Sequence, residues 1–332
     1  MNRRRTTLAL VTAALTAGLL VATAPHLREH LGPAFAALAD ADRTWLAVAA
    51  CSFLAAFACT VGAWRAAFAS AGARICPRQA AARLGVGSLV NAFAPAKLGD
   101  AVKVALFSRA IESPGRLWTA SGSYASLAAT RALALAALVV ASSATGAMPL
   151  WPVFVLVAGA GIVAVAATAS TRFRSHARVA QLLAGVEALV RSPRALTSVV
   201  CWTIGMELAR LGGTVAAAHA LGVPHPFLAA LVILPALDVA GAIPLTPGSI
   251  GVGSGAVAVA LASRGIGMSQ ALAVGLAIQG VETIVSISCG TTGLGYLLRP
   301  NPRARRIAGR VAVVGASSAL AALVGAMLFD LV

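Results

Sequence analysis

Residues 44–69 read TWLAVAACSFLAAFACTVGAWRAAFA, an apolar stretch that carries a single charge, at Arg65. A helix needs about 20 mainly apolar residues to cross the hydrocarbon core of a bilayer. Six further stretches along the chain have this character: 7–24, 118–142, 150–169, 195–221, 269–298 and 311–330. The sequence therefore predicts an all-α, polytopic membrane bundle, with about seven spanning helices in a single membrane domain over residues 1–332.

The composition agrees with this prediction. Hydrophobic residues make up 59% of the chain and charged residues 11%, and the mean hydropathy is +0.88. A soluble domain carries roughly a quarter charged residues, because water must wet its surface. This composition excludes a soluble or secreted globular domain. Residues 1–24 resemble a signal peptide, but Pro25 would directly follow the cleavage site, so we expect an uncleaved first helix.

Two more apolar stretches, at about 80–112 and 227–263, are interrupted by proline, glycine and charge. Their halves are short for spans, so we predict two re-entrant helical hairpins, which a membrane tolerates only where protein or water covers the broken backbone. The first would enter from the cytoplasm and the second from outside. Opposed interruptions of this kind are typical of transporters with inverted repeats. The two halves share no convincing sequence identity, so the repeat is inferred from geometry alone.

Basic residues decide the orientation. The net charge is +16, and 21 of the 26 Lys and Arg residues lie beside apolar segments, in clusters at 3–5, 65–83, 97–116, 172–194 and 299–310. The positive-inside rule then predicts a cytoplasmic N-terminus, a cytoplasmic basic loop at about 171–194 and a location in the cell inner or plasma membrane. Aromatic residues are only 5% of the chain, so no base-stacking surface is expected and nucleic acid is not a predicted partner.

Eight ionisable residues fall inside the predicted membrane segments: Lys97, Asp100, Lys103, Arg131, Glu207, Arg210, Asp238 and Glu282. An unpaired charge near the bilayer centre costs roughly 2.5–3.5 kcal/mol, so these side chains should face one another or water. Glu207 and Arg210 are three residues apart and can pair on one helix. Arg131 needs an acid from elsewhere, either Glu282 or Asp238. Whether Glu207, Arg210, Asp238 and Glu282 form a charge relay or only neutralise one another stays open.

The first hairpin contains NAFAPAKLGD at residues 91–100. Pro95 ends the first half-helix and Gly99 lets the backbone turn, while Lys97, Asp100 and Lys103 recur at three-residue spacing on one helix face. Free amides at the start of the second half-helix add partial positive charge. The pattern predicts a phosphate-binding site that includes Asn91. A cytoplasmic loop whose lysines only follow the positive-inside rule is the alternative.

The second hairpin contains IPLTPGSIGVGSG at residues 243–255. Two prolines break the helix, and Pro247, Gly248 and Gly251 are candidate substrate-binding residues; glycines that serve only close packing explain the segment as well. No Gly-Lys-Ser/Thr follows a strand, so we exclude nucleotide binding. We also find no His/Glu cluster at ligand spacing and no nucleophile motif, so we expect no metal, no cofactor, no catalytic residue and no enzymatic activity.

These two motifs, together with Trp64-Arg65 at the end of the second span, resemble the membrane domain of the lysylphosphatidylglycerol synthase/flippase family. The resemblance rests on the segments Asn91–Lys103 and Pro244–Val252 and covers most of the chain. The family's Arg-x-Gly-Glu is here Lys97-x-Gly99-Asp100, which preserves both charges. Ser254 stands where relatives commonly have an acid, and Gln279 lies near the position of their Arg. Losing both charges together leaves neither stranded in lipid.

The resemblance implies translocation, between leaflets, of a phospholipid or lipid-linked saccharide with a polar or phosphate-bearing headgroup. Lys97, Lys103 and Arg131 would hold the phosphate, Asp100 would orient the lysines, and the chain would hydrolyse no ATP. We expect no aminoacyl-transferase domain and hence no lipid synthesis. Two alternatives remain: a non-catalytic partner of a separate membrane glycosyltransferase or acyltransferase, docked at 172–194, and a secondary transporter of small anions.

Overall fold

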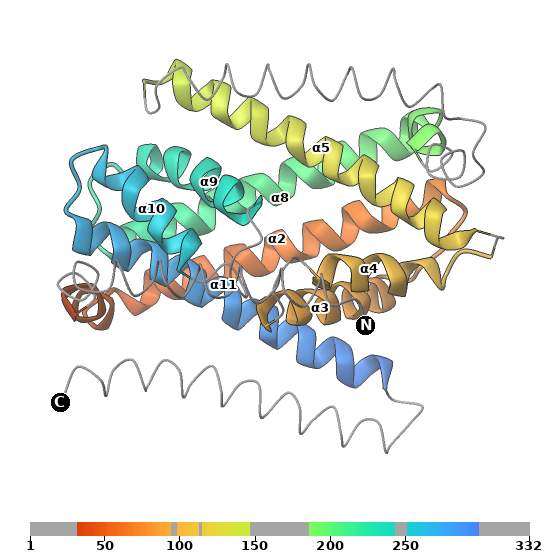
Figure 1. The fold of residues 1–332 in the computed structure, drawn as a ribbon, viewed down its shortest axis with the longest axis horizontal. Helices are drawn as coiled ribbons and strands as arrows, with labels where there is room; N and C mark the ends of the chain where they lie inside the picture. The colour runs from red at the N-terminus through yellow and green to blue at the C-terminus, as the bar shows by residue number, and fades with distance from the viewer. Residues whose placement is uncertain (1–31, 94–97, 113–114, 147–185, 243–250, 299–332) are drawn as a thin grey trace, which may run out of the picture.

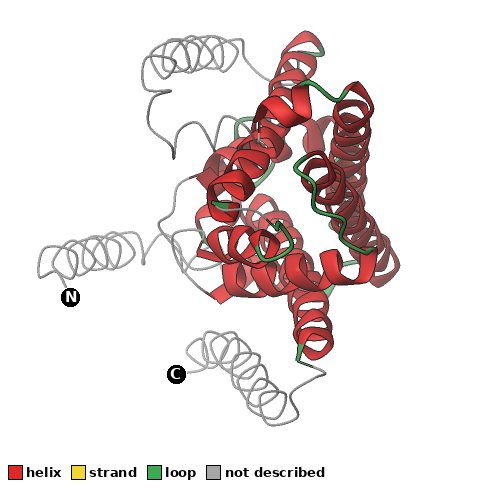
Figure 2. Ribbon diagram, turned by 90° about the vertical axis from the view of Figure 1, so that its right-hand side faces the viewer, coloured by secondary structure: helices red, strands yellow, loops and turns green. Residues whose placement is uncertain are grey.

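The computed structural model describes residues 32–93, 98–112, 115–146, 186–242 and 251–298. In these residues the regular structure is helical and no strand occurs, which confirms the all-α prediction (Figures 1 and 2). The principal helices are α2 (Arg43–Ser70), α3 (Pro77–Phe93), α4 (Leu98–Ser108), α5 (Arg116–Ala144), α8 (Pro193–Ala220), α9 (Pro226–Ala242), α10 (Val252–Ala262) and α11 (Met268–Leu297).

Three of the described helices, α2, α5 and α11, are long and apolar enough to cross a membrane. They confirm the spans predicted at 44–69, 118–142 and 269–298. The span predicted at 195–221 is the helix α8, whose 28 residues give it a length of about 42 Å. Glu207 and Arg210 lower its hydropathy, so α8 does not count among the three. The spans predicted at 7–24, 150–169 and 311–330 lie outside the described residues.

The helices form two sets of matching length. Helices α2, α3, α4 and α5 contain 28, 17, 11 and 29 residues. Helices α8, α9, α10 and α11 contain 28, 17, 11 and 30 residues in the same order. We call α2–α5 repeat 1 and α8–α11 repeat 2. The agreement lies in the lengths and order of the helices, not in their side chains.

The two repeats run in opposite directions. The N–H of Asp42, which caps the start of α2, donates to the carbonyl of Ala220 at the end of α8. Near the other end of α2, Gly62 lies against the ring of Trp202, close to the start of α8. Helices α2 and α8 are therefore antiparallel along their lengths. As a result, the α3–α4 pair and the α9–α10 pair lie at opposite ends of the bundle (Figure 1).

Each predicted hairpin is a pair of packed helices. Helix α3 is about 25 Å long and α4 about 17 Å, both shorter than a hydrocarbon core of about 30 Å. Gly99 of α4 packs against the backbone of Gly87 and the side chain of Asn91, both on α3. In repeat 2, Gly253 of α10 lies beside Leu237 of α9. Whether each pair enters and leaves the membrane on one side stays a prediction.

Buried hydrophobic residues form two clusters along the α2–α8 pair. One contains Phe53 from the first half of α2 and packs with α9, α10 and α11. The other contains Trp64 and Phe68 from the second half of α2, which pack on Phe107 of α4. Each cluster therefore anchors one helix pair, and the polar residues described next lie between them.

Candidate functional site

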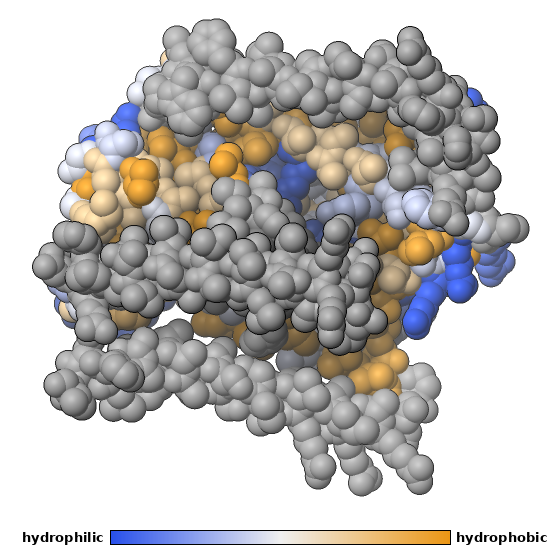
Figure 3. Space-filling model, viewed as in Figure 1, coloured by the Kyte–Doolittle hydropathy of each residue, from blue (hydrophilic) through white to orange (hydrophobic). Residues whose placement is uncertain are grey.

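A cavity of about 750 Å³ opens among α2, α3, α4, α5, α8, α9 and α11. Its polar lining comes from both repeats: Thr60, Ser88, Asn91, Asp100, Lys103, Tyr124, Arg131, Thr203, Arg210, Asp238, Gln279, Glu282, Thr283 and Ser286. Hydrophilic residues are visible inside a hollow that hydrophobic residues surround (Figure 3). A polar chamber of this size within a membrane bundle has the volume typical of a ligand site.

The first charged group in the cavity is the Asp100 cluster, formed by Asn91, Asp100, Lys103 and Tyr124. Asn91 Nδ2 and Lys103 Nζ donate to Asp100 Oδ1, at 2.9 and 2.8 Å. The hydroxyl of Tyr124 donates to Asp100 Oδ2 at 3.1 Å. One carboxylate thus joins α3, α4 and α5. Asp100 is in the first turn of α4, where a negative charge also stabilises the helix dipole.

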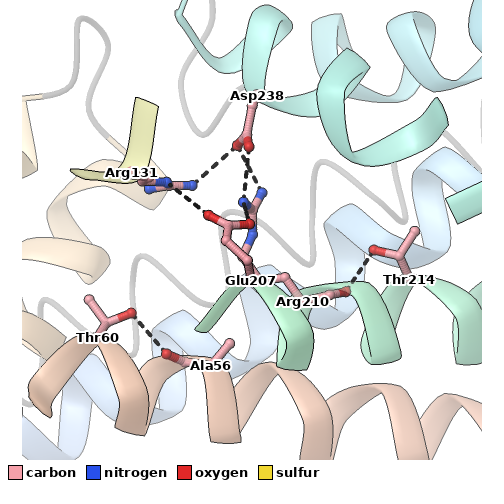
Figure 4. A network of polar contacts seen from close by, with 7 residues as sticks. All are labelled: Ala56, Thr60, Arg131, Glu207, Arg210, Thr214 and Asp238. Carbon is pink, nitrogen blue, oxygen red and sulfur yellow. Dashed lines mark hydrogen bonds and ion pairs between the residues drawn. The ribbon is translucent and has the colours of Figure 1, made fainter. Parts of the chain in front are cut away.

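The second group is the arginine cluster, formed by Arg131, Glu207, Arg210 and Asp238 (Figure 4). Arg210 donates from Nη1 to Glu207 Oε2 at 3.0 Å, which confirms the predicted pair on one helix. It also binds both oxygens of Asp238, at 3.0 and 2.9 Å. This two-pronged geometry is the strongest form of an Arg–carboxylate contact. Arg210 therefore serves to join α8 to α9.

Arg131 is held differently. Its Nη2 donates to Asp238 Oδ1 at 3.2 Å, and its Nε lies 3.7 Å from Glu207 Oε1. Asp238 was one of the two acids predicted for it, and Glu282 was the other. The Arg131 side chain is 49% exposed, whereas those of Arg210 and Lys103 are 12% and 15% exposed. Of these three cations, Arg131 is therefore the one most accessible to a ligand.

Glu282, on α11, lines the same cavity. The charged groups that face it are Arg210, Asp238 and Arg131. Those three side chains bind one another, and Glu282 makes no hydrogen bond or ion pair within the described part of the chain. It is the carboxyl of the cavity that lacks a cation of its own there.

The glycine motif of repeat 2 has a structural place. Gly251 precedes α10 with φ = +92°, a left-handed conformation that favours glycine, and is exposed rather than part of the cavity lining. Ser254 is 1% exposed and packs against Gly275, and the amide of Gln279 lies beside Gly253. The candidates Pro95, Lys97, Pro247 and Gly248 lie outside the described residues.

Sequence reasoning missed Tyr124 and the role of Gln279 as a cavity residue. A phenolic hydroxyl in an apolar span needs a partner, and that was the signal available for Tyr124. Among the described residues, no group of three or more His, Cys, Asp and Glu is arranged to hold a metal. What the cavity offers a ligand is the half-exposed guanidinium of Arg131, whose planar donors suit carboxylate and phosphate oxygens.

Comparison with known proteins gives one finding. The family model described as "Lysylphosphatidylglycerol synthase TM region" matches residues 7–290, which include both hairpins, the Asp100 cluster and the arginine cluster. The match agrees with the resemblance inferred from the two motifs. No curated protein sequence matches the chain.

Proposed function

We propose, from the premise that this chain belongs to the lysylphosphatidylglycerol synthase transmembrane family, that it moves a lipid with a phosphate-bearing headgroup between membrane leaflets. The membrane domain of this family is associated with lipid flipping or synthesis. The proposed cargo is a phospholipid or a lipid-linked saccharide, and the chain moves it without hydrolysing ATP. The supporting observation is the cavity, which places the half-exposed side chain of Arg131 among hydroxyl groups and ion pairs.

The barrier to lipid flipping is the transfer of a charged headgroup through hydrocarbon. An unpaired charge there costs several kcal/mol, whereas acyl chains lose nothing by staying in lipid. A polar cavity open to the bilayer removes most of this cost, because its groups replace the water around the phosphate. The hydroxyl groups of Thr60, Thr283 and Ser286 supply neutral partners, and Arg131 supplies the charge.

The proposed roles follow from exposure. Arg131 binds the phosphate directly, and Asp100 holds Lys103 at the edge of the site, as the 2.8 Å contact permits. Lys97 and the free amides at the start of α4 add positive potential, as their positions in the sequence predict. Arg210 binds Asp238, and Asp238 in turn holds the side chain of Arg131 in place. Pro247 and Gly248 stay candidate substrate-binding residues on the basis of their sequence motif alone.

The test is leaflet exchange of fluorescent lipids by the purified protein in liposomes. The panel compares phosphatidylglycerol, a zwitterionic lipid and a polyprenyl-phosphate sugar. Arg131→Gln removes the exposed charge, and Arg116→Gln, at the exposed first residue of the same helix, is the matched control. Losing a charge-assisted hydrogen bond of about 1.5–3 kcal/mol slows exchange by roughly 10- to 100-fold.

Undiminished exchange by Arg131→Gln would contradict the role given to that residue. The Lys97→Ala, Lys103→Ala double variant tests the predicted lysines in the same way. No exchange for any lipid would argue against flipping. It would then favour a partner of a membrane glycosyltransferase or acyltransferase, detected by co-purification, or a small-anion transporter, detected by uptake.

A further inference from the structure

The ionisable groups in and beside the cavity do not balance. In the described residues the cations are Lys103, Arg131 and Arg210, and the carboxyls are Asp100, Glu207, Asp238 and Glu282. Asp100 is matched by Lys103, and the two arginines are matched by Glu207 and Asp238. With every group ionised, these side chains carry one negative charge in excess.

The excess lies at Glu282. The helices packed against α11 are α2, α3, α8 and α10. The residues that α2 and α3 place in the cavity are uncharged, α10 contains no titratable residue, and α8 contributes Arg210. Arg210 is already bound by two carboxylates, and Asp238 and Arg131 are the remaining charged groups that face Glu282. Glu282 therefore lines the cavity with no cation of its own among the described residues.

Headgroup binding would increase this imbalance. A phosphate that takes donors from Arg131 competes with Asp238 and Glu207, which now share them. It also adds a negative charge to the described ionisable side chains, which already have one in excess. A proton on Glu282 cancels the added charge within the same cavity. Phosphate binding and proton binding then favour each other, and this coupling is reciprocal.

We propose that Glu282 takes a proton from water when an anionic headgroup enters the cavity and releases it to water when the headgroup leaves. One proton then moves with each monoanionic phosphate, and the step transfers no net charge across the membrane. This inference rests on the proposed function and identifies its coupling ion. Glu207 and Asp238 are not the proton carriers, because each already neutralises an arginine.

The first test measures proton uptake on binding. Dihexanoyl-phosphatidylglycerol, a short-chain soluble lipid, is added to the purified full chain in weakly buffered detergent with a pH-sensitive dye. The wild-type protein should take up protons as it binds the lipid, approaching about one proton per lipid. Glu282→Gln should take up none. Glu112→Gln, which changes an exposed glutamate outside the cavity, is the matched control and should behave as wild type.

The second test measures coupling in liposomes. A trace of fluorescent phosphatidylglycerol is placed in a zwitterionic host with a pH difference of about one unit, and valinomycin and potassium hold the membrane potential at zero. One proton per lipid drives the wild-type distribution toward a roughly tenfold excess in one leaflet. Glu282→Gln should leave the label evenly distributed between leaflets, and Glu112→Gln should reproduce the excess.

The outcomes separate the two proposals. Lipid binding by the wild-type protein without proton uptake would overturn the role of Glu282, and this result needs no variant to fold. Exchange that ignores the pH gradient in the wild type, or follows it equally in Glu282→Gln, would do the same and leave flipping intact. Neither binding nor exchange by the wild-type protein would overturn the proposed function, and the inference would fail with it.

Discussion

Repeat 1 and repeat 2 have helices of nearly the same lengths in the same order, but different side chains at corresponding positions. Helices α4 and α10 are both 11 residues long, and the second residue of each is a glycine, Gly99 or Gly253, that packs closely on a neighbouring helix. The third residue is Asp100 in repeat 1 and Ser254 in repeat 2. Asp100 binds three side chains, whereas the hydroxyl of Ser254 donates only to the carbonyl of Gly251, at 3.3 Å. The close approach of the helices requires glycine at the second position. The third position is not restricted by this packing, so its side chain can differ between the repeats.

The same comparison divides the cavity by charge. Among the described residues, repeat 1 supplies two cations and one carboxyl, which are Lys103, Arg131 and Asp100. Repeat 2 supplies one cation and three carboxyls, which are Arg210, Glu207, Asp238 and Glu282. In the part of the chain that the structure describes, the ion pairs that cross between the repeats are those of Arg131. The cation that we assign to the headgroup therefore also joins the two halves, and headgroup binding weakens that join.

The largest loss of stability is expected when the carboxylate of Asp100 is copied to the corresponding position of repeat 2, Ser254. Ser254→Asp places a carboxylate at a site that is 1% exposed and contains no cation among the described residues. An unpaired buried charge destabilises a protein by about 3–5 kcal/mol, so little folded protein should be recovered. Thermal unfolding in detergent measures the loss. Ser263→Asp, at the exposed end of the same helix, is the control, and equal stability of the two variants would contradict the comparison.

A smaller loss of stability is expected when the ion pairs between the repeats are removed. Asp238→Asn keeps the size of the side chain but removes the charge that binds Arg210 and Arg131. Weakening these charge-assisted hydrogen bonds should lower the free energy of unfolding by about 2–3 kcal/mol. Glu187→Gln changes the exposed pair with Arg191 and should have little effect. If both variants unfold alike, the arginine cluster does not connect the repeats.

The packing between repeats gives the next effect. Helix α11 meets α3 through Gly290, where an added Cβ would collide with the side chain of Leu89 and the carbonyl of Gly85. Overpacking of this kind costs about 1–3 kcal/mol, so Gly290→Ala should lower the unfolding temperature. Gly280→Ala, on the same helix but with open space beside it, should not. A loss in both variants would point to α11 itself and not to its contact with α3.

The sequence predicts the features of the fold that depend on residues close together in the chain. The spans 44–69, 118–142 and 269–298 match α2, α5 and α11 within two residues at each end, because uninterrupted apolar runs define them. Proline and glycine marked both helix pairs, and the spacing of Glu207 and Arg210 revealed their pairing.

Contacts between segments far apart in the chain could not be predicted from the sequence. Arg131 pairs with Asp238 across 107 positions, and no local pattern distinguishes that acid from Glu282. The opposed hairpins indicate an inverted repeat, but the sequence alone does not show that the helices of the two repeats agree in length. The two halves share lengths that packing requires and differ in the side chains that a sequence comparison would align.

The smallest loss of stability is expected from a change at Tyr124, which belongs to repeat 1 and donates a hydrogen bond to Asp100. Tyr124→Phe removes one hydrogen bond to Asp100 and leaves those from Asn91 and Lys103 in place. The free energy of unfolding should fall by about 1 kcal/mol. If Asp100 alone makes repeat 1 different, the change should have no effect once Asp100 is replaced by Ser. A double-mutant cycle measures this, and a full Tyr124→Phe loss in the Asp100→Ser background would place the tyrosine's partner elsewhere.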